Sequence, residues 1–181
     1  MHNRGFALFG LIGPVLAYVF IGISIVKAPW FSWWDNALSD LGHALRSESA
    51  PYFNLGLASC GFLTVAYAVT ALRTHAKHTS VCLAISAFLL QLVAVFDEVY
   101  GALHLAVSVL FFISLGVSTL VYAVEKRSFA AITALTIGLS SWLLYWAGFY
   151  RAGISVPESI SATAAVSWVM LSACRTYLRR P

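Results

Sequence analysis

The segment Trp30–Asn54, WFSWWDNALSDLGHALRSESAPYFN, is the longest polar stretch in a chain that is otherwise almost continuously apolar. Ionisable and hydroxyl side chains are concentrated there, next to aromatic residues of the kind that anchor proteins at a membrane surface. The segment therefore predicts a lid over a polar pocket at one end of a small membrane bundle. Its polar members are Asp35, Ser39, Asp40, His43, Arg46 and Glu48, and its aromatic members are Trp30, Phe31, Trp33 and Trp34.

The composition of the chain is that of a membrane protein. Of its 181 residues, 60% are hydrophobic and only 10% are charged, whereas soluble domains carry about 25% charged residues. Backbone polar groups inside a bilayer must be hydrogen-bonded within the protein, so long apolar segments are expected to be helices. We therefore predict an all-α polytopic membrane protein that forms a single domain over residues 1–181.

Six segments are long enough to cross the membrane as helices, because a hydrocarbon core of about 30 Å needs about 20 residues. No small-residue cleavage site follows the first segment, so a retained helix is expected there and not a signal peptide. The predicted spans are Phe6–Val26, Pro51–Leu72, Ser80–Phe96, Leu103–Val124, Phe129–Phe149 and Pro157–Tyr177.

The charges divide unequally between the two sides of this topology. With the N-terminus inside, eight of the eleven basic residues lie on the inner side. The positive-inside rule then predicts a multi-pass protein of the plasma (cytoplasmic) membrane with both termini cytoplasmic. The inner basic residues are Arg4, Arg73, Lys77, Lys126, Arg127, Arg175, Arg179 and Arg180; the outer acids are Asp35, Asp40, Glu48, Asp97, Glu98 and Glu158.

The first outer loop contains Ser39-Asp40-Leu41-Gly42-His43. If Ala37–Leu45 is a short interfacial helix, Asp40 and His43 share one face, as do Ser39 and His43. These side chains would then point into the pocket beneath the loop. The alternative is a surface helix with Asp35 as its N-cap and its other polar groups in water.

Two acids end the third span and a histidine opens the fourth, in Phe96-Asp97-Glu98 and His104. An ionisable group at the edge of a membrane is a functional candidate, because placing a charge in the bilayer is costly. Glu98 and His104 can face each other only if the chain reverses between them. The alternative for His104 is structural, since a hydrogen bond to a carbonyl or an acid would tie two helices together.

The third polar segment precedes the last span and includes Arg151, Ser155 and Glu158. Ser155-x-x-Glu158 fits a capping box, in which the two side chains satisfy backbone N–H groups at the start of a helix. Alternatively, Glu158 joins the acids of the first two segments in the pocket. Arg151 could then neutralise one of these acids or bind an anionic headgroup.

Four motifs match a known pattern: Asn36-Ala37-Leu38-Ser39-Asp40-Leu41-Gly42; Ala50-Pro51-Tyr52-Phe53-Asn54-Leu55-Gly56; Phe96-Asp97-Glu98 followed by His104 and Phe111-Phe112; and Val156-Pro157-Glu158. In this order they resemble the membrane family known as domain of unknown function 998. The Ser-Asp-x-Gly pattern is more distantly similar to the six-helix group that includes the Frag1 and autophagy-modulator families. The resemblance implies six helices in the same order and supports the site positions, but it implies no particular reaction.

Three classes of function fit these features. The first is a non-catalytic lipid-binding protein or accessory membrane subunit, with membrane lipids or other membrane subunits as partners. The second is a membrane-embedded hydrolase or transferase that acts on a lipid or isoprenoid, and the third is a small transporter. In the enzyme, Asp40, Glu98, His104 and Glu158 would be catalytic. Asp40, Glu98 and His104 could also hold a divalent metal ion that activates water.

The residues expected to contact a lipid or substrate come from all three outer segments. Haem is not expected, because axial ligation needs histidines facing each other and only His104 lies near a span. Nucleic acid is not expected as a partner, because the basic residues lie at helix ends and not in one patch. The expected contact residues are Ser39, His43, Asn54, Arg151 and Trp34.

Overall fold

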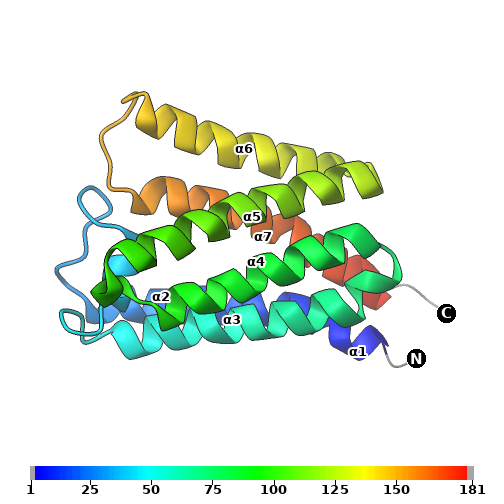
Figure 1. Ribbon diagram of the computed structural model, residues 1–181, viewed down its shortest axis with the longest axis horizontal. Helices are drawn as coiled ribbons and strands as arrows, with labels where there is room; N and C mark the ends of the chain where they lie inside the picture. The colour runs from blue at the N-terminus through cyan, green and yellow to red at the C-terminus, as the bar shows by residue number, and fades with distance from the viewer. Residues whose placement is uncertain (1–2, 179–181) are drawn as a thin grey trace.

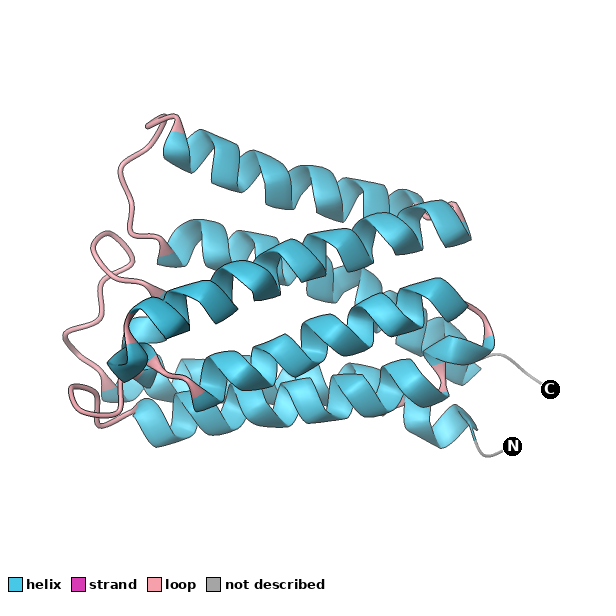
Figure 2. Ribbon diagram, in the orientation of Figure 1, coloured by secondary structure: helices cyan, strands magenta, loops and turns pink. Residues whose placement is uncertain are grey.

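The computed structural model describes residues 3–178, and this part of the chain is helical with no β-strand (Figure 1, Figure 2). Short 3-10 turns, labelled η, separate several of the helices. The elements are α1 Asn3–Ala7, α2 Phe9–Lys27, η1 Leu38–Gly42, α3 Ala50–Thr70, η2 Leu72–Thr74, α4 Lys77–Val95, η3 Glu98–Tyr100, α5 Ala102–Lys126, α6 Phe129–Trp146 and α7 Ser155–Leu178.

Large apolar side chains cover the outer surface of the bundle: Phe62 is 65% exposed, Val124 73% and Phe129 81%. A surface of this kind is expected against lipid and not against water. The chain is therefore a multi-pass membrane protein. Five helical segments of the described chain are long and apolar enough to cross a membrane: Arg4–Lys27, Ala50–Thr74, Lys77–Val95, Ala102–Lys126 and Phe129–Trp146.

The sixth predicted span corresponds to α7, which is not among these five segments. α7 is as long as the others but is rich in serine, threonine and alanine. Several of these side chains face other helices, since Ser161, Ser172 and Thr176 are buried. Small polar side chains at contacts between membrane helices are common, and those of α7 account for part of its lower hydropathy.

The helices form a ring with one helix outside it. α2, α3, α4 and α5 pack as successive neighbours, and α7 closes the ring against α2 (Figure 1). α6 lies outside the ring, against α5 and α7. α1 begins and α7 ends at the same end of the bundle, here called the termini end. The opposite end, the lid end, carries residues 28–49, 96–101 and 147–154.

Close contacts between helices depend on glycine. A Cβ on Gly56 of α3 would lie 2.5 Å from the Cβ of Phe20 in α2. A Cβ on Gly61 would lie 2.6 Å from the carbonyl oxygen of Ala87 in α4. Helices in membranes commonly associate in this way, because small residues let two backbones approach closely.

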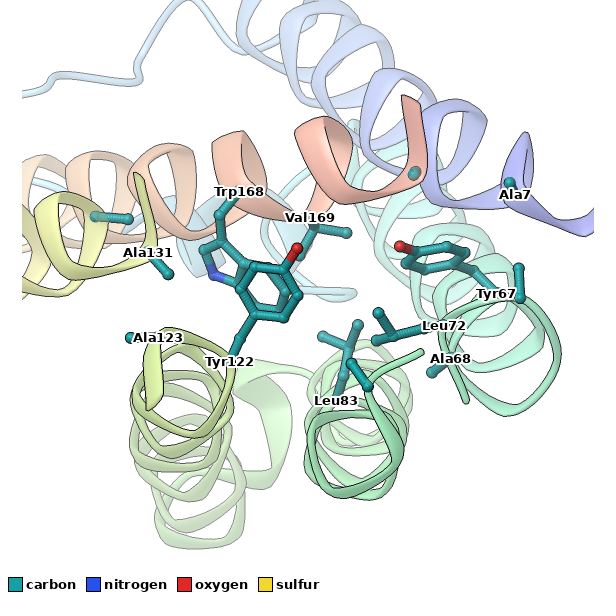
Figure 3. Packing of buried hydrophobic residues seen from close by; sticks show 14 of the residues in the cluster. Ala7, Tyr67, Ala68, Leu72, Leu83, Tyr122, Ala123, Ala131, Trp168 and Val169 are labelled. Atoms are coloured by element: carbon teal, nitrogen blue, oxygen red, sulfur yellow. The ribbon is translucent and has the colours of Figure 1, made fainter. Parts of the chain in front are cut away.

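Buried aromatic and aliphatic side chains fill the bundle at both ends. At the termini end, the ring of Tyr122 in α5 stacks on Trp168 in α7 with 4.4 Å between ring centroids (Figure 3). Nearby, the hydroxyl of Tyr67 donates a hydrogen bond to Ser172 Oγ at 3.0 Å. At the lid end, Leu41 of η1 is fully buried, a contribution of about 1.5–3 kcal/mol for a side chain of this size. Packing against η1 therefore holds the lid to the bundle.

Backbone hydrogen bonds join the lid, residues 28–49, to the segment that precedes α7. Gly153 N donates to Trp33 O at 2.9 Å, and Ser155 N donates to Asn36 O at 3.1 Å. A side chain at position 153 would collide with the backbone of Asn36. Glycine at this position therefore allows the two segments to approach closely enough to form these bonds.

The lid contains less helix than the sequence predicted. The expected helix over Ala37–Leu45 is only the five-residue turn η1. It ends early because Gly42 O accepts a hydrogen bond from Asn54 Nδ2 of α3 at 2.9 Å, which turns the chain toward α3. The alternative role of Asp35 as its N-cap is wrong, because that carboxylate accepts from Ser32 Oγ at 2.8 Å.

We expect Gly42→Ala to destabilise the protein by about 1–3 kcal/mol, the usual cost of overpacking a filled site. A Cβ at position 42 would lie 2.6 Å from Asn54 Oδ1 and 2.7 Å from Phe53 Cδ1. Thermal unfolding in detergent, followed by circular dichroism, measures the loss. Gly116→Ala is the control, because a Cβ there meets no atom within 4 Å. Equal melting temperatures for the two variants would contradict the role assigned to Gly42.

Candidate functional site

Carboxylates from three separate segments meet around η1 at the lid end, and the first belongs to η1 itself. Asp40 Oδ2 accepts hydrogen bonds from Asn36 Nδ2 and from Ala37 N, both at 2.9 Å. Backbone N–H groups at the start of a helical turn lack partners within it, and a carboxylate at the third position can satisfy them. Asp40 therefore stabilises the start of η1.

The second carboxylate comes from the first turn of α7. Glu158 Oε2 accepts a hydrogen bond from Leu38 N of η1 at 2.9 Å. The predicted capping box is wrong, because Ser155 Oγ donates to Trp33 O at 3.4 Å instead of bonding within α7. The start of α7 does not need the box, since Val156 N and Glu158 N already bond the carbonyls of Gly153 and Ile154. The structure thus brings Glu158 to the lid, as the alternative prediction proposed.

The third carboxylate belongs to η3, between α4 and α5. Glu98 Oε1 accepts a hydrogen bond from Ser39 Oγ at 3.0 Å. Burial and the hydrogen bond and negative charge of the neighbouring Asp40 raise the pKa of Glu98 to about 7, against the opposing effects of Ser39 and Arg46. Two carboxylates close together cannot both ionise easily, so a proton is retained at this site near neutral pH.

His104 lies at the start of α5 and is buried. Its Nδ1 is 2.7 Å from Phe96 O, and its Nε2 is 3.3 Å from Ser108 Oγ. These contacts tie the end of α4 to α5, which is the structural alternative considered for this residue. They occupy both ring nitrogens and direct neither of them to a carboxylate.

The predicted metal ligands do not assemble in one place. No group of three or more His, Cys, Asp or Glu side chains within residues 3–178 is arranged to hold a metal ion. Asp40 and Glu98 lie together, but the nitrogens of His104 bond elsewhere. A metal bound by these three residues stays a sequence prediction that this geometry does not support.

A polar cavity of about 670 Å³ opens at the lid end, between the lid, η3 and the starts of α5 and α7. His43 and Arg46 of the lid border it together with the residues described above. Among the residues that the structure describes, Arg46 is the only Lys or Arg that lines it. The polar side chains of its lining are Ser39, His43, Arg46, Glu98, His104, Ser108 and Glu158.

An apolar cavity of about 460 Å³ lies deeper in the bundle, between α2, α3, α4, α5 and α7. Its lining is mostly aliphatic and aromatic, and Ser86 of α4 is one of its few polar residues. The Ser86 hydroxyl is buried and has no hydrogen-bond partner in the described part of the chain. Ser39, Ser108 and Glu158 line both cavities, so the two cavities meet at these residues.

Three of the predicted contact residues lie outside both cavities. Trp34 is 71% exposed, and Arg151 is also exposed. Asn54 donates to the carbonyl of Gly42 and so holds the lid in place. A ligand inside either cavity would therefore not contact these three residues.

Sequence reasoning missed several polar residues along the cavities. Ser108 follows His104 by one helical turn, a spacing that places both on one face and could have indicated it. Tyr18 OH and Thr163 Oγ1 share a hydrogen bond of 2.7 Å between α2 and α7. They, like Ser86, are single polar residues inside apolar spans, and no local pattern distinguishes such residues from ordinary packing.

We expect the melting temperature to fall as the pH rises from about 5 to about 8, and Glu98→Gln to reduce this fall. The folded protein holds a proton on Glu98 up to a pKa of about 7, whereas an unperturbed carboxyl titrates near 4.5. The raised pKa therefore stabilises the folded state below pH 4.5, and this contribution is lost as the pH rises through 7.

Thermal unfolding across this range in detergent measures the effect. Glu48→Gln is the control, because Glu48 is an exposed acid of the lid, at the same end of the bundle as Glu98. The same pH dependence in wild type and Glu98→Gln would contradict the protonated state assigned to Glu98.

Comparison with known families shows which family the chain belongs to. Residues 11–175 match the family model described as protein of unknown function (DUF998). No curated protein and no solved structure is significantly similar to the chain. The more distant similarity to the Frag1 group stays a prediction. The match covers most of the 181 residues, including all three segments that meet at η1, and the chain belongs to the DUF998 family.

Proposed function

We propose that this protein binds a single-chain amphiphile of the membrane, with the apolar tail in the apolar cavity and the head in the polar cavity. In this proposal α7 is a sixth span, both termini are cytoplasmic and the lid end faces outward.

The observation that carries the proposal is the junction of the two cavities at Ser39, Ser108 and Glu158. Ligand pockets of proteins are commonly about 300–1,000 Å³ and mostly apolar, with a few polar groups that orient the ligand. The apolar cavity matches this description, and its polar end adjoins the carboxylate site at the three shared residues. An amphiphile has the same division between an apolar part and a polar part.

The orientation is supported by the positions of the basic residues. The termini end carries Arg4, Arg73, Lys77, Lys126, Arg127 and Arg175, whereas the lid end carries Lys27, Arg46 and Arg151. Arg179 and Arg180, which the prediction also counted, lie outside the described residues. The majority at the termini end favours a cytoplasmic location for that end.

The headgroup is expected to donate hydrogen bonds. The carboxyl groups of Glu98 and Glu158 line the polar cavity. Of the Lys and Arg residues that the structure describes, Arg46 alone lines it. Carboxylates accept hydrogen bonds and attract cations, so an amine or a hydroxyl-rich head fits the site better than an anionic head.

Filling the apolar cavity is expected to remove ligand binding. Gly22 of α2 lines this cavity and has no atom within 4 Å of a Cβ position, so Gly22→Phe can enter open space. Gly116→Phe is the matched control, because position 116 is equally open and does not line the cavity. Protein in polymer nanodiscs is incubated with deuterated tetradecylamine, and the retained probe is measured by mass spectrometry. Equal retention by wild type and Gly22→Phe would contradict the proposal.

The headgroup preference is tested with probes of one chain length. At about pH 8, above the pKa of about 7 of Glu98, wild-type protein should retain tetradecylamine or monomyristoylglycerol over myristate, because the ionised carboxylates repel the anionic head. Glu98→Gln should narrow this preference while leaving the tail contacts in place. Retention of myristate equal to that of the amine would contradict the headgroup assignment.

A second candidate function is hydrolysis of a lipid ester, favoured by one observation. The hydroxyl of Ser39 donates to Glu98 at 3.0 Å at the junction of the two cavities, where the bond between a head and a tail would lie. A hydroxyl bonded to a carboxyl of raised pKa has the arrangement of a nucleophile and its base.

Turnover of 4-nitrophenyl myristate tests this candidate. Ser39→Ala should reduce turnover by about a hundredfold or more, and Ser159→Ala, a serine of the apolar cavity, should not. Absence of turnover by the wild type would reject the enzyme and leave the binding function.

A further inference from the structure

A third cavity, of about 390 Å³, lies at the termini end of the bundle. It is formed by the end of α5, the start of α6 and the end of α7, far from the carboxylate site (Figure 1). Its inner wall includes Tyr122, whose ring is fixed against Trp168 (Figure 3). Hydroxyl groups of Ser128, Ser172 and Thr176 also line it.

The charged residues of this cavity are all basic. Lys126 and Arg127 come from the end of α5, and Arg175 comes from the last turn of α7. Lys126 Nζ donates to His75 O at 3.1 Å, a bond that keeps it beside the cavity without neutralising its charge. Three positive charges therefore border one polar cavity.

No carboxylate of the described residues lines this cavity. Within residues 3–178, Glu125 is the only acidic side chain near this end, since the other six lie in or beside the lid-end segments. Both oxygens of Glu125 face the start of α4: Oε1 accepts from His78 N at 3.1 Å, and Oε2 accepts from Thr79 N at 2.8 Å and Thr79 Oγ1 at 2.6 Å. The three basic side chains are exposed, and their local excess of positive charge attracts anions.

We infer that this cavity binds a phosphate monoester, with the headgroup of an anionic phospholipid as its source in the membrane. Guanidinium groups pair with phosphate oxygens through two hydrogen bonds, and a lysine adds a point charge. Basic pockets between the ends of transmembrane helices are a common site for anionic headgroups. The α5–α6 connection places the pocket at the helix ends, the depth at which a headgroup lies.

The test measures phosphatidic acid binding to the full chain in detergent by native mass spectrometry. The double variant Arg127→Asn/Arg175→Gln removes two cavity charges, and asparagine suits the left-handed backbone at position 127, where φ is 47°. The control Arg73→Gln/Lys77→Gln removes two exposed charges at the same end that do not line the cavity. We expect the cavity variant to bind about 10- to 30-fold more weakly than wild type and the control to stay within about threefold.

Phosphatidylcholine and soluble glycerol 3-phosphate complete the experiment. Stronger binding of phosphatidic acid than of either compound supports a lipid headgroup as the source. Glycerol 3-phosphate binding as tightly as the lipid, with the same loss in the cavity variant, supports the phosphate site with a soluble source. Equal effects of the two double variants, or equal binding of phosphatidylcholine and phosphatidic acid, would overturn the inference. None of these outcomes depends on the lid-end cavities.

Discussion

The lid end depends on hydrogen bonds between carboxylates and a single 3-10 turn. The backbone N–H groups of Ala37 and Leu38 need acceptors at the edge of an apolar bundle, and Asp40 and Glu158 supply them. The hydroxyl of Ser39 takes Glu98 as its partner. Burying carboxylates is costly unless they are hydrogen-bonded, so the turn and the acids stabilise each other. The Ser-Asp-Leu-Gly motif is explained by this arrangement, together with the burial of Leu41 and the contact of Gly42 with Asn54.

Much of the fold could be predicted from the sequence because a bilayer leaves few choices. The predicted span Pro51–Leu72 compares with α3, Ala50–Thr70, and Leu103–Val124 compares with α5, Ala102–Lys126. Length and hydropathy alone locate such helices. Prediction from hydropathy is less certain for α7. Several of its polar side chains face neighbouring helices, and they lower the hydropathy by which a span is recognised.

The site could be predicted only in part. Acids and a histidine gathered on one side of the topology predicted that Asp40, Glu98, His104 and Glu158 would lie together. The three acids do meet around η1, but neither ring nitrogen of His104 bonds a carboxylate. Rules based on local sequence spacing failed to predict the hydrogen-bond partners of individual side chains. Ser155 and Glu158 have capping-box spacing, but a distant partner, Leu38, takes the carboxylate. Cavities arise from the packing of five helices, and no single stretch of sequence contains that information.

The bonds between the lid and the segment before α7 have a consequence for biosynthesis. Leu38 and Glu158 are 120 positions apart, and a chain leaves the ribosome from its N-terminus. While α2 to α6 are being made, the lid has neither the carboxylate of Glu158 nor the backbone of Gly153 to bind. The bonds to Glu158 and Gly153 therefore form only after translation reaches the last helix, whereas the contacts of η1 with α3 can form earlier.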